Sequence, residues 1–229
     1  MPTVAIVVAG GPGTRLGAKG PKGFVQLAGE PLVVRSLRAM LASPAVDRAI
    51  VVVPSGLLAR ARALLEPFND AARPFTSVEG GAERQDSVRL GMAAAGDADL
   101  LAIHDAARPF VSRATVDAVI AAARTHGAAI VAVPATDTIK QVHADGWIEA
   151  TPAREHLWLA QTPQVFRADL LRSAHARAVD RAATDDAALV EALGQRVYVV
   201  RGNPENRKIT TPDDLRWAEW WLAQSPAPR

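Results

Sequence analysis

The sequence of 229 residues contains no cysteine, which excludes disulfide bonds and metal sites built on thiolates. It also lacks any apolar run of the roughly 20 residues that a membrane-spanning helix needs. No basic segment followed by an apolar stretch opens the chain, so we see no secretory signal. We therefore expect a cytoplasmic protein that does not bind membranes.

An excess of one charge is missing as well. Lysine and arginine number 26 against 24 acidic residues, a net charge of +2, and the basic residues are spread along the chain. A nucleic-acid partner is therefore not expected, and any bound anion should be small and local. The hydrophobic content of 49% is ample for a full core, and no linker or internal repeat divides the chain. We expect a single domain over residues 1–229.

Apolar segments and helical patterns alternate along the chain, which predicts an α/β fold with a mostly parallel, twisted sheet and helices on both faces. The expected strands are residues 4–9, 24–27, 49–53, 75–78, 99–103, 129–133 and 197–200. The expected helices are residues 31–42, 55–66, 84–95, 112–126, 168–182, 185–193 and 212–222. Ser55 and Ser112 are predicted to cap their helices. Trp217, Trp220 and Trp221 are predicted to pack against the body from one face of the last helix.

The alternation breaks after Pro134. Residues 136–143 and 147–151 flank Ala144-Asp145-Gly146, and an Asp-Gly pair between two such stretches predicts a β-hairpin. Two exposed strands are only marginally stable in water. We therefore interpret residues 135–160 or so as an inserted arm that packs on another subunit, with a solvated flap as the alternative.

A glycine-rich segment with three cations and no acidic residue follows the first predicted strand. It contains the glycines and cations Gly10, Gly11, Gly13, Arg15, Lys19 and Lys22. Glycine lets the backbone approach a ligand closely, and successive free N–H groups form an anion-binding concavity. The cations add full charges for phosphate oxygens. The segment predicts a polyphosphate-binding loop.

Two well-known phosphate-binding motifs do not fit this loop. A Walker A motif requires Ser or Thr after its lysine, but Gly20 follows Lys19 and Gly23 follows Lys22. The dinucleotide fingerprint requires a third glycine where Leu16 stands. A dehydrogenase is therefore disfavoured, and an ordinary glycine-rich turn with solvated cations is the remaining alternative.

Further polar segments follow other predicted strands and should meet the loop at the carboxyl edge of the sheet. They are Gly80-Gly81 with Arg84 and Ser87, and His104-Asp105 with Arg108. Asp105 is a candidate ligand for Mg²⁺ or for a hydroxyl, because Mg²⁺ needs few carboxylates when phosphates supply its other ligands. Each residue also has an alternative structural role. Asp105 could cap a helix or form an ion pair with Arg108, and Arg84 and Ser87 could simply begin a helix. His104 could be a packing residue at the end of its strand. The set favours phosphoryl or nucleotidyl transfer over hydrolysis.

These segments, taken together, resemble the 2-C-methyl-D-erythritol 4-phosphate cytidylyltransferase (IspD) family of the non-mevalonate pathway to isoprenoids. The matching segments run in family order along almost the whole chain. They are residues 9–17, Pro21-Lys22, Gly80-Gly81, residues 84–88, residues 104–109, Asp137-Thr138, Arg154, Leu157-Trp158, residues 161–164, Thr184-Asp185-Asp186, Asn206 and Lys208-Ile209-Thr210.

The resemblance implies a Rossmann-like nucleotidyltransferase fold, a homodimer joined by hairpin arms, and Mg²⁺-dependent transfer of CMP from CTP to methylerythritol 4-phosphate with release of pyrophosphate. It implies catalytic roles for Arg15 and Lys22, and nucleotide binding by Gly10, Gly11, Gly13, Gly81, Arg84 and Ser87. It implies substrate binding by Asp105, Arg108, Thr138, Arg154, Thr162 and Lys208, with Thr138 and Arg154 supplied by the partner's arm.

Two rival functions remain at this stage. A related cytidylyltransferase for another polyol phosphate, such as ribitol 5-phosphate, would share the nucleotide loop and differ around the arm and Arg154, where Thr151-Pro152-Ala153 departs from the family pattern. A non-catalytic nucleotide-binding module is the other rival. The presence of Arg15, Lys22, Asp105 and Lys208 together argues against that module.

Overall fold

The computed structural model describes residues 1–11, 13–17, 20–178 and 183–224. Lys19 and the last part of the helix predicted over residues 168–182 lie outside the described residues.

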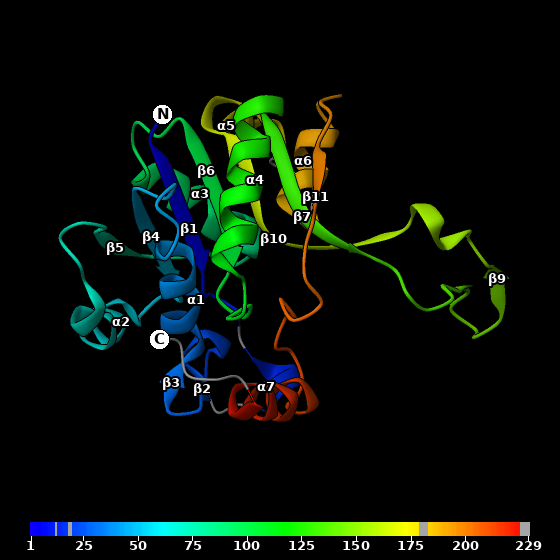
Figure 1. Cartoon of the computed structure of the whole chain (residues 1–229), viewed down its shortest axis with the longest axis horizontal. Helices are drawn as coiled ribbons and strands as arrows, with labels where there is room; N and C mark the ends of the chain where they lie inside the picture. The colour runs from blue at the N-terminus through cyan, green and yellow to red at the C-terminus, as the bar shows by residue number, and fades with distance from the viewer. Residues whose placement is uncertain (12, 18–19, 179–182, 225–229) are drawn as a thin grey trace.

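A twisted seven-stranded sheet runs through the middle of the molecule in the order β11-β7-β10-β6-β1-β4-β5 (Figure 1). Its strands are β1 (Thr3–Val8), β4 (Arg48–Val53), β5 (Phe75–Glu79), β6 (Leu100–Asp105), β7 (Ala128–Pro134), β10 (Trp158–Arg167) and β11 (Tyr198–Arg201). Strand β10 is antiparallel to both of its neighbours, and every other pairing is parallel. The prediction of a mostly parallel sheet is confirmed.

The central strands are almost entirely apolar because both of their faces are covered. In β1, Ala5 and Val7 join the core on one face, whereas Val4 and Ile6 join the core on the other. The register places Ile6 beside Ile50 of β4 and Ile103 of β6, all three fully or almost fully buried. Alternate residues of the central strands thus pack against the helical layers on the two faces of the sheet.

The helices divide between these layers. Helices α1 (Leu32–Leu41), α2 (Leu58–Leu65) and α4 (Arg113–His126) cover the first face, and α3 (Arg84–Ala94), α5 (Ala168–Arg177) and α6 (Asp186–Glu191) cover the second. The last helix, α7 (Pro212–Gln224), shares a small apolar cluster with the short strand β2 (Gln26–Leu27), which pairs with β3 (Glu30–Pro31). Within the described part of the chain, no helix is long and apolar enough to cross a membrane.

The chain order creates a crevice beyond the carboxyl end of β1. From β1 the chain proceeds to β4 and β5 on one side, and then returns to β6 on the other side of β1. The loops that leave β1 and β6 therefore diverge in opposite directions. Ligands of open α/β sheets bind at such a switch point.

Most helix limits agree with the sequence, with two corrections. Ser112 does cap α4, because its hydroxyl accepts a hydrogen bond from the Thr115 N–H at 3.2 Å. Ser55 does not cap α2, which begins three residues later. Gly56 turns the chain there with φ 77°, and the Ser55 hydroxyl contacts Glu79 instead.

The tryptophans of α7 differ in their packing. Trp220 is 56% exposed, so its predicted packing against the body is wrong, whereas Trp217 stacks on Trp221.

The sequence did not predict β10, although this ten-residue strand lies inside the sheet between β6 and β7. Pro163 stands in the middle of it, and a proline without an N–H argues against a central strand. The structure accommodates Pro163 because the pairing with β7 shifts register between Ala160 and Gln164.

The predicted hairpin is present as an arm that projects from the body between β7 and β10 (Figure 1). Its strands β8 (Gln141–Val142) and β9 (Ile148–Ala150) are shorter than the sequence predicts, and Gly146 occupies the turn with φ 93°. Val142, Trp147 and Ile148 are 51%, 75% and 60% exposed. The arm thus leaves apolar side chains uncovered by its own chain.

A substitution at Gly91 tests the close packing of α3 on the sheet. A Cβ there would lie 2.6 Å from Ile6 Cγ2 and 3.0 Å from Val52 Cγ2. We expect Gly91→Ala to lower the free energy of unfolding by about 1–3 kcal/mol in urea titrations, because overpacking outweighs the better helix propensity of alanine. Gly20→Ala is the control, since nothing lies within 4 Å of its Cβ position. Equal stability of the two variants would contradict the packing account.

Candidate active site

A cleft of about 260 Å³ opens at the carboxyl ends of β1, β5 and β6. It brings together the three segments that the sequence analysis selected. Its lining includes Gly10, Gly11, Lys22, Gly81, Arg84, Ser87, Asp105 and Lys208. Gly13 and Arg15 belong to the same glycine-rich loop but are absent from this lining.

The glycine-rich loop is shaped by its own backbone. Gly13 and Gly17 flank a 3₁₀ turn (Thr14–Leu16), and both have positive φ, 76° and 67°. A Cβ on Gly13 would lie 2.9 Å from the Gly20 carbonyl oxygen. The Lys22 N–H donates to the Gly11 carbonyl at 3.0 Å, which closes the loop. The backbone geometry therefore requires glycine at position 13. The side chain of Arg15, within the 3₁₀ turn, is exposed.

The opposite wall of the cleft is the start of α3. A capping box between Glu83 and Asp86 fixes this helix end. Ser87 is buried, and its Oγ would lie 2.6 Å from a Cβ on Gly80 and 3.4 Å from a Cβ on Gly10. Gly80 thus permits the close approach of α3, and Ser87 faces both glycine segments.

Asp105 is the electrostatic centre of the site. Its Oδ1 lies 3.3 Å from Arg84 Nε, and its Oδ2 lies 2.7 Å from Lys208 Nζ. Burial alone would raise the pKa of Asp105, but Arg84, Lys208 and Arg108 together hold that pKa well below its usual range. The carboxylate is therefore ionised. It is neither a helix cap nor the direct ion-pair partner of Arg108.

His104 links β6 to β10 from a fully buried position. Its Nε2 lies 3.1 Å from the Arg108 carbonyl oxygen and its Nδ1 lies 2.9 Å from Thr162 Oγ1. Because a carbonyl only accepts, the proton is on Nε2, so the Thr162 hydroxyl donates to Nδ1 while accepting from the Asp105 N–H. Burial lowers the pKa of His104 to about 4, so its ring is neutral at neutral pH. His104 orients its neighbours, and no proton transfer needs to be assigned to it.

Arg84 has a second acidic partner that the sequence analysis did not assign. Its Nη1 lies 2.8 Å from Oδ2 of Asp186, whose Oδ1 lies 3.0 Å from His175 Nε2. Asp186 and His175 are 1% and 2% exposed. The two carboxylates raise the pKa of Arg84 against the effect of burial. The Thr184-Asp185-Asp186 motif was the only sequence signal for this anchor.

Lys22 lies near other cations at the mouth of the cleft. Its ammonium donates to Thr210 Oγ1 at 3.2 Å. Burial, followed by the charges of Lys208 and Arg15, lowers the pKa of Lys22 to about 8, against the opposing effects of Asp105 and Asp214. A concentration of positive charge is thus held close to the glycine-rich loop, as binding of a polyphosphate requires.

A second cleft of about 240 Å³ adjoins the first, because Arg84, Asp105 and Lys208 line both. The other residues around it include Arg108, Gln161, Thr162, Gln164 and Asp185. The Arg108 guanidinium donates to the carbonyls of Asn206 and Ala160 at 2.8 and 3.2 Å. Two ligand sites can therefore meet at the Asp105–Lys208 ion pair.

Thr138 and Arg154, two of the predicted substrate-binding residues, line neither cleft. Both are exposed on the arm, where Arg154 Nη1 donates to the Thr136 carbonyl at 2.5 Å. The prediction that they serve the partner's site is consistent with this placement, but it stays a prediction.

The site fits Mg²⁺ only as an ion held mainly by a ligand. Among the described residues, no group of three acidic or histidine side chains is arranged to hold a metal. Two carboxylates line the first cleft: Glu83, whose side chain caps α3, and Asp105, whose oxygens are each already in an ion pair. A single carboxylate suffices for Mg²⁺ when phosphate oxygens and water complete the octahedron.

Comparisons with known proteins agree with this geometry. Residues 3–224 match the family model described as IspD: 2-C-methyl-D-erythritol 4-phosphate cytidylyltransferase. The chain is 46% identical over 218 residues to the cytidylyltransferase of that name from Pelotomaculum thermopropionicum, covering 94% of this chain and 92% of the relative. It is 48% identical over 225 residues to the one from Nocardia farcinica, covering 98% and 95%.

Solved structures give the same result. The crystal structure of 2-C-methyl-D-erythritol 4-phosphate cytidylyltransferase from Thermus thermophilus has a TM-score of 0.79 and 35% identity, over 97% of this chain and 100% of that one. The 4-diphosphocytidyl-2C-methyl-D-erythritol synthase from Anaerococcus prevotii has a TM-score of 0.85 and 26% identity, over 97% and 99%.

The anchoring of Arg84 can be tested through stability. We expect Asp186→Ala to lower the free energy of unfolding by about 2–4 kcal/mol, because it leaves Arg84 and His175 without a buried partner. Urea unfolding measures the change. Asp169→Ala is the control, since Asp169 pairs with Arg167 in an exposed position and should cost less than about 1 kcal/mol. Similar losses in both variants would show that Asp186 is not a structural anchor.

Proposed function

The chain belongs to the 2-C-methyl-D-erythritol 4-phosphate cytidylyltransferase family, and on that premise we propose how its own residues perform the transfer. The reaction moves CMP from CTP to 2-C-methyl-D-erythritol 4-phosphate and gives 4-diphosphocytidyl-2-C-methyl-D-erythritol and pyrophosphate. It belongs to the non-mevalonate (MEP) route to isoprenoid precursors.

The chemistry requires cations more than a base. An oxygen of the acceptor's phosphate forms a bond to the α-phosphorus of CTP, and the bond from that phosphorus to the bridging oxygen of the β-phosphate breaks, so that pyrophosphate leaves. The second pKa of a phosphate monoester is near 6, so the attacking oxygen is already anionic at neutral pH. The barrier lies in bringing two anions together, which fixed positive charge lowers.

The observation that carries the proposal is the meeting of the two clefts at Asp105 and Lys208. The cleft lined by the glycines would hold CTP, with Gly10, Gly11, Gly81, Arg84 and Ser87 as its contacts, and Gly13 would shape the loop that carries the first two. The adjoining cleft would hold the polyol phosphate, with Asp105, Arg108, Thr162 and Lys208 around it. The reacting atoms would then lie where the clefts join.

Each cation has a distinct role in this arrangement. Lys22 and Arg15 would stabilise the charge that accumulates on the α-phosphoryl oxygens in the transition state. Lys208 has three N–H donors, and Asp105 occupies one of them, so the others are free for the acceptor's phosphate. Asp105 neutralises part of this charge before the substrates bind, which allows the cations to lie close together.

Mg²⁺ is part of the proposal as a bound cofactor. It would be held by the phosphate oxygens of CTP together with Asp105, and it would supply further charge neutralisation at the phosphates. We also propose that the protein works in the cytoplasm, where its nucleotide substrate is available.

A homodimer joined by the arms completes the proposed site. The uncovered apolar side chains of the arm, together with the 55% exposed Leu159 at its base, support a partner surface there. Thr138 and Arg154 would then reach the acceptor bound to the other subunit. A second copy is preferred to a different partner because the arm carries two residues that the resemblance assigns to the site.

The proposed function is tested by pyrophosphate release. Purified protein is incubated with CTP, Mg²⁺ and methylerythritol 4-phosphate, with ribitol 5-phosphate in a parallel reaction. We expect release with methylerythritol 4-phosphate only. Release with ribitol 5-phosphate alone would move the acceptor to another polyol, and no release from either, with CTP still bound, would favour a non-catalytic nucleotide-binding protein.

Removal of the Lys22 charge should affect rate more than binding. We expect Lys22→Ala to lower kcat by roughly 100-fold or more, because it removes a charge that acts on the transition state. Steady-state kinetics with CTP varied measures kcat and KM separately, and thermal unfolding confirms that the variant is folded. A near-normal kcat would contradict the catalytic role.

Mixing two inactive variants tests whether Arg154 acts in the partner's site. Lys22→Ala and Arg154→Ala proteins are each expected to be inactive alone. In a mixed dimer, one site would combine an intact Lys22 with an intact Arg154 from the other chain. Half of the dimers would be mixed and one of their two sites complete, so about a quarter of the normal activity should return. No recovery after subunit exchange would place Arg154 in its own chain's site.

A further inference from the structure

The turn between β11 and α7 makes two contacts with the site. Lys208 reaches Asp105, and two residues later Thr210 reaches Lys22. Lys208 is one of the residues that the resemblance places in the site, but Thr210 is not.

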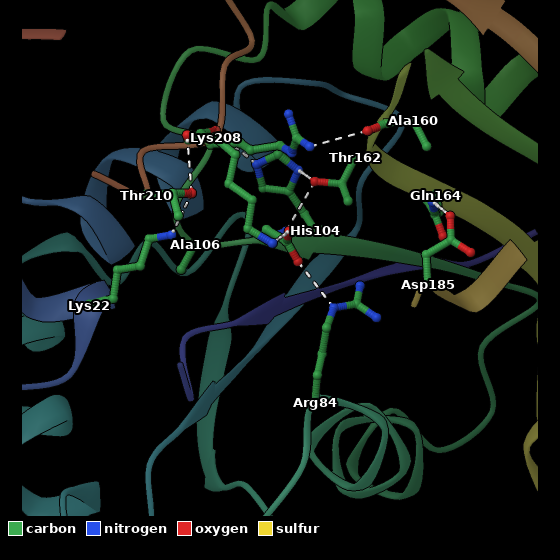
Figure 2. A network of polar contacts seen from close by, with 12 residues as sticks. Lys22, Arg84, His104, Ala106, Ala160, Thr162, Gln164, Asp185, Lys208 and Thr210 are labelled. Carbon is green, nitrogen blue, oxygen red and sulfur yellow. Dashed lines mark hydrogen bonds and ion pairs between the residues drawn. The ribbon is translucent and has the colours of Figure 1, made fainter. Parts of the chain in front are cut away.

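The contact between Lys22 and Thr210 has a defined direction. An ammonium group can only donate, so the Thr210 oxygen, 3.2 Å from Lys22 Nζ, is the acceptor. The Thr210 hydroxyl in turn directs its proton to the Lys208 carbonyl at 3.4 Å. Figure 2 shows Lys22, Thr210 and Lys208 in this order. One of the three N–H donors of Lys22 is thereby used, which leaves two for phosphoryl oxygens.

The backbone of Thr210 is itself fixed by the start of α7. Asp214 Oδ2 accepts the N–H groups of both Thr210 and Thr211 at 2.9 Å, and Thr211 Oγ1 accepts the Asp214 N–H at 3.2 Å. This reciprocal pattern is a capping box. Arg207 pairs with the other oxygen of Asp214 at 2.8 Å. The hydroxyl of Thr210 is therefore presented from a rigid helix end.

The same turn is also tied to the sheet. Ile209 is fully buried, and its N–H donates to the carbonyl of Ala107, just beyond β6, at 2.8 Å. The turn thus holds a fixed position relative to Asp105. Without the Thr210 contact, Lys22 would have no hydrogen bond from its ammonium group to any described residue.

The surroundings of Lys22 disfavour its charged form unless a hydrogen-bond acceptor meets its ammonium group. Lys208 and Arg15 disfavour its charged form, Asp105 and Asp214 favour it, and burial disfavours it most. A hydroxyl oxygen that accepts from the ammonium favours the charged form without adding a negative charge that would repel a phosphate. The Thr210 hydroxyl accepts a hydrogen bond from the Lys22 ammonium and adds no negative charge.

We propose that Thr210 is a positioning residue for the transfer reaction, which holds the Lys22 ammonium beside the nucleotide cleft. The inference rests on the catalytic role of Lys22 in the proposed function. It goes further by assigning a residue that acts through Lys22 from the C-terminal turn.

The test compares Thr210→Val, which removes the hydroxyl at nearly constant shape, with Thr210→Ser, which keeps it. Thr125→Val is the control, because it removes an exposed hydroxyl of α4 that donates to the Ala121 carbonyl and does not contact Lys22. The first measurement is kcat/KM for CTP against pH, which reports the ionisation of the free enzyme. Thermal unfolding of every variant accompanies it.

The wild-type profile should be high between about pH 6, where the acceptor phosphate loses its second proton, and about pH 8. It should fall as the pH rises through about 8, since the charged form of Lys22 is the active one. In Thr210→Val this fall should move to lower pH, and kcat should decrease about tenfold. Thr210→Ser should restore both. Thr125→Val should leave both kcat and the pH of the fall unchanged.

A second measurement does not depend on activity. The chain contains four lysines, so the titration of Lys22 can be followed by NMR of ¹³C-labelled lysine side chains, with Lys22→Arg to assign the signal. A lower pKa of Lys22 in Thr210→Val than in the wild type supports the proposal. An unchanged pKa of Lys22 in Thr210→Val, or an equal decrease of that pKa in Thr125→Val, would overturn it.

The NMR measurement also separates this inference from the proposed function. If the wild type releases no pyrophosphate but the Lys22 signal still shifts in Thr210→Val, the function fails while the contact stands. If Thr210→Val does not fold, the same titration in Thr210→Ala decides, with an unchanged Lys22 pKa as the contradicting result.

Discussion

The site depends on the buried carboxylate of Asp105. A lone buried charge would cost several kcal/mol, so the fold must bring cations to it. Arg84, from the start of α3, and Lys208, from the turn before α7, supply the two ion pairs. Three segments that are distant in the chain therefore converge at the end of β6. The ion pairs hold Arg84 and Lys208 at the junction of the two clefts. Phosphate groups of the substrates would there replace part of the interaction of these cations with Asp105.

A supporting layer keeps this centre in place. Asp186 holds Arg84 from behind, and the neutral His104 fixes the backbone of Asp105 through Thr162. These groups are buried and hydrogen-bonded, so they orient the site without adding free charge to it. The buried residues Asp186, His104 and Thr162 therefore fix the geometry of the site. The more exposed Lys208 and the cations of the glycine-rich loop can bind the substrates.

Local patterns predicted much of the fold and part of the site. The apolar runs located the parallel strands, and the glycines, Lys22 and Asp105 followed strand ends as expected. Strand β10 was missed because Pro163 is atypical of a central strand, and only the register shift with β7 accommodates it. The bond between Arg84 and Asp186 spans 102 residues, and a buried ion pair of that kind has no periodic signature in a sequence. Tertiary pairing, rather than local preference, decides such contacts.

The ionisation of Asp105 tests the central claim most directly. Its carboxyl carbon can be followed by ¹³C NMR against pH in the protein without ligands, with Asp105→Asn to assign the signal. An ordinary aspartic acid is half protonated near pH 3.9 or so. The account predicts that Asp105 is still ionised there, because Arg84 and Lys208 hold its pKa well below its usual range against the effect of burial. Titration at the ordinary value, or above it, would show that the cations do not converge on this carboxylate.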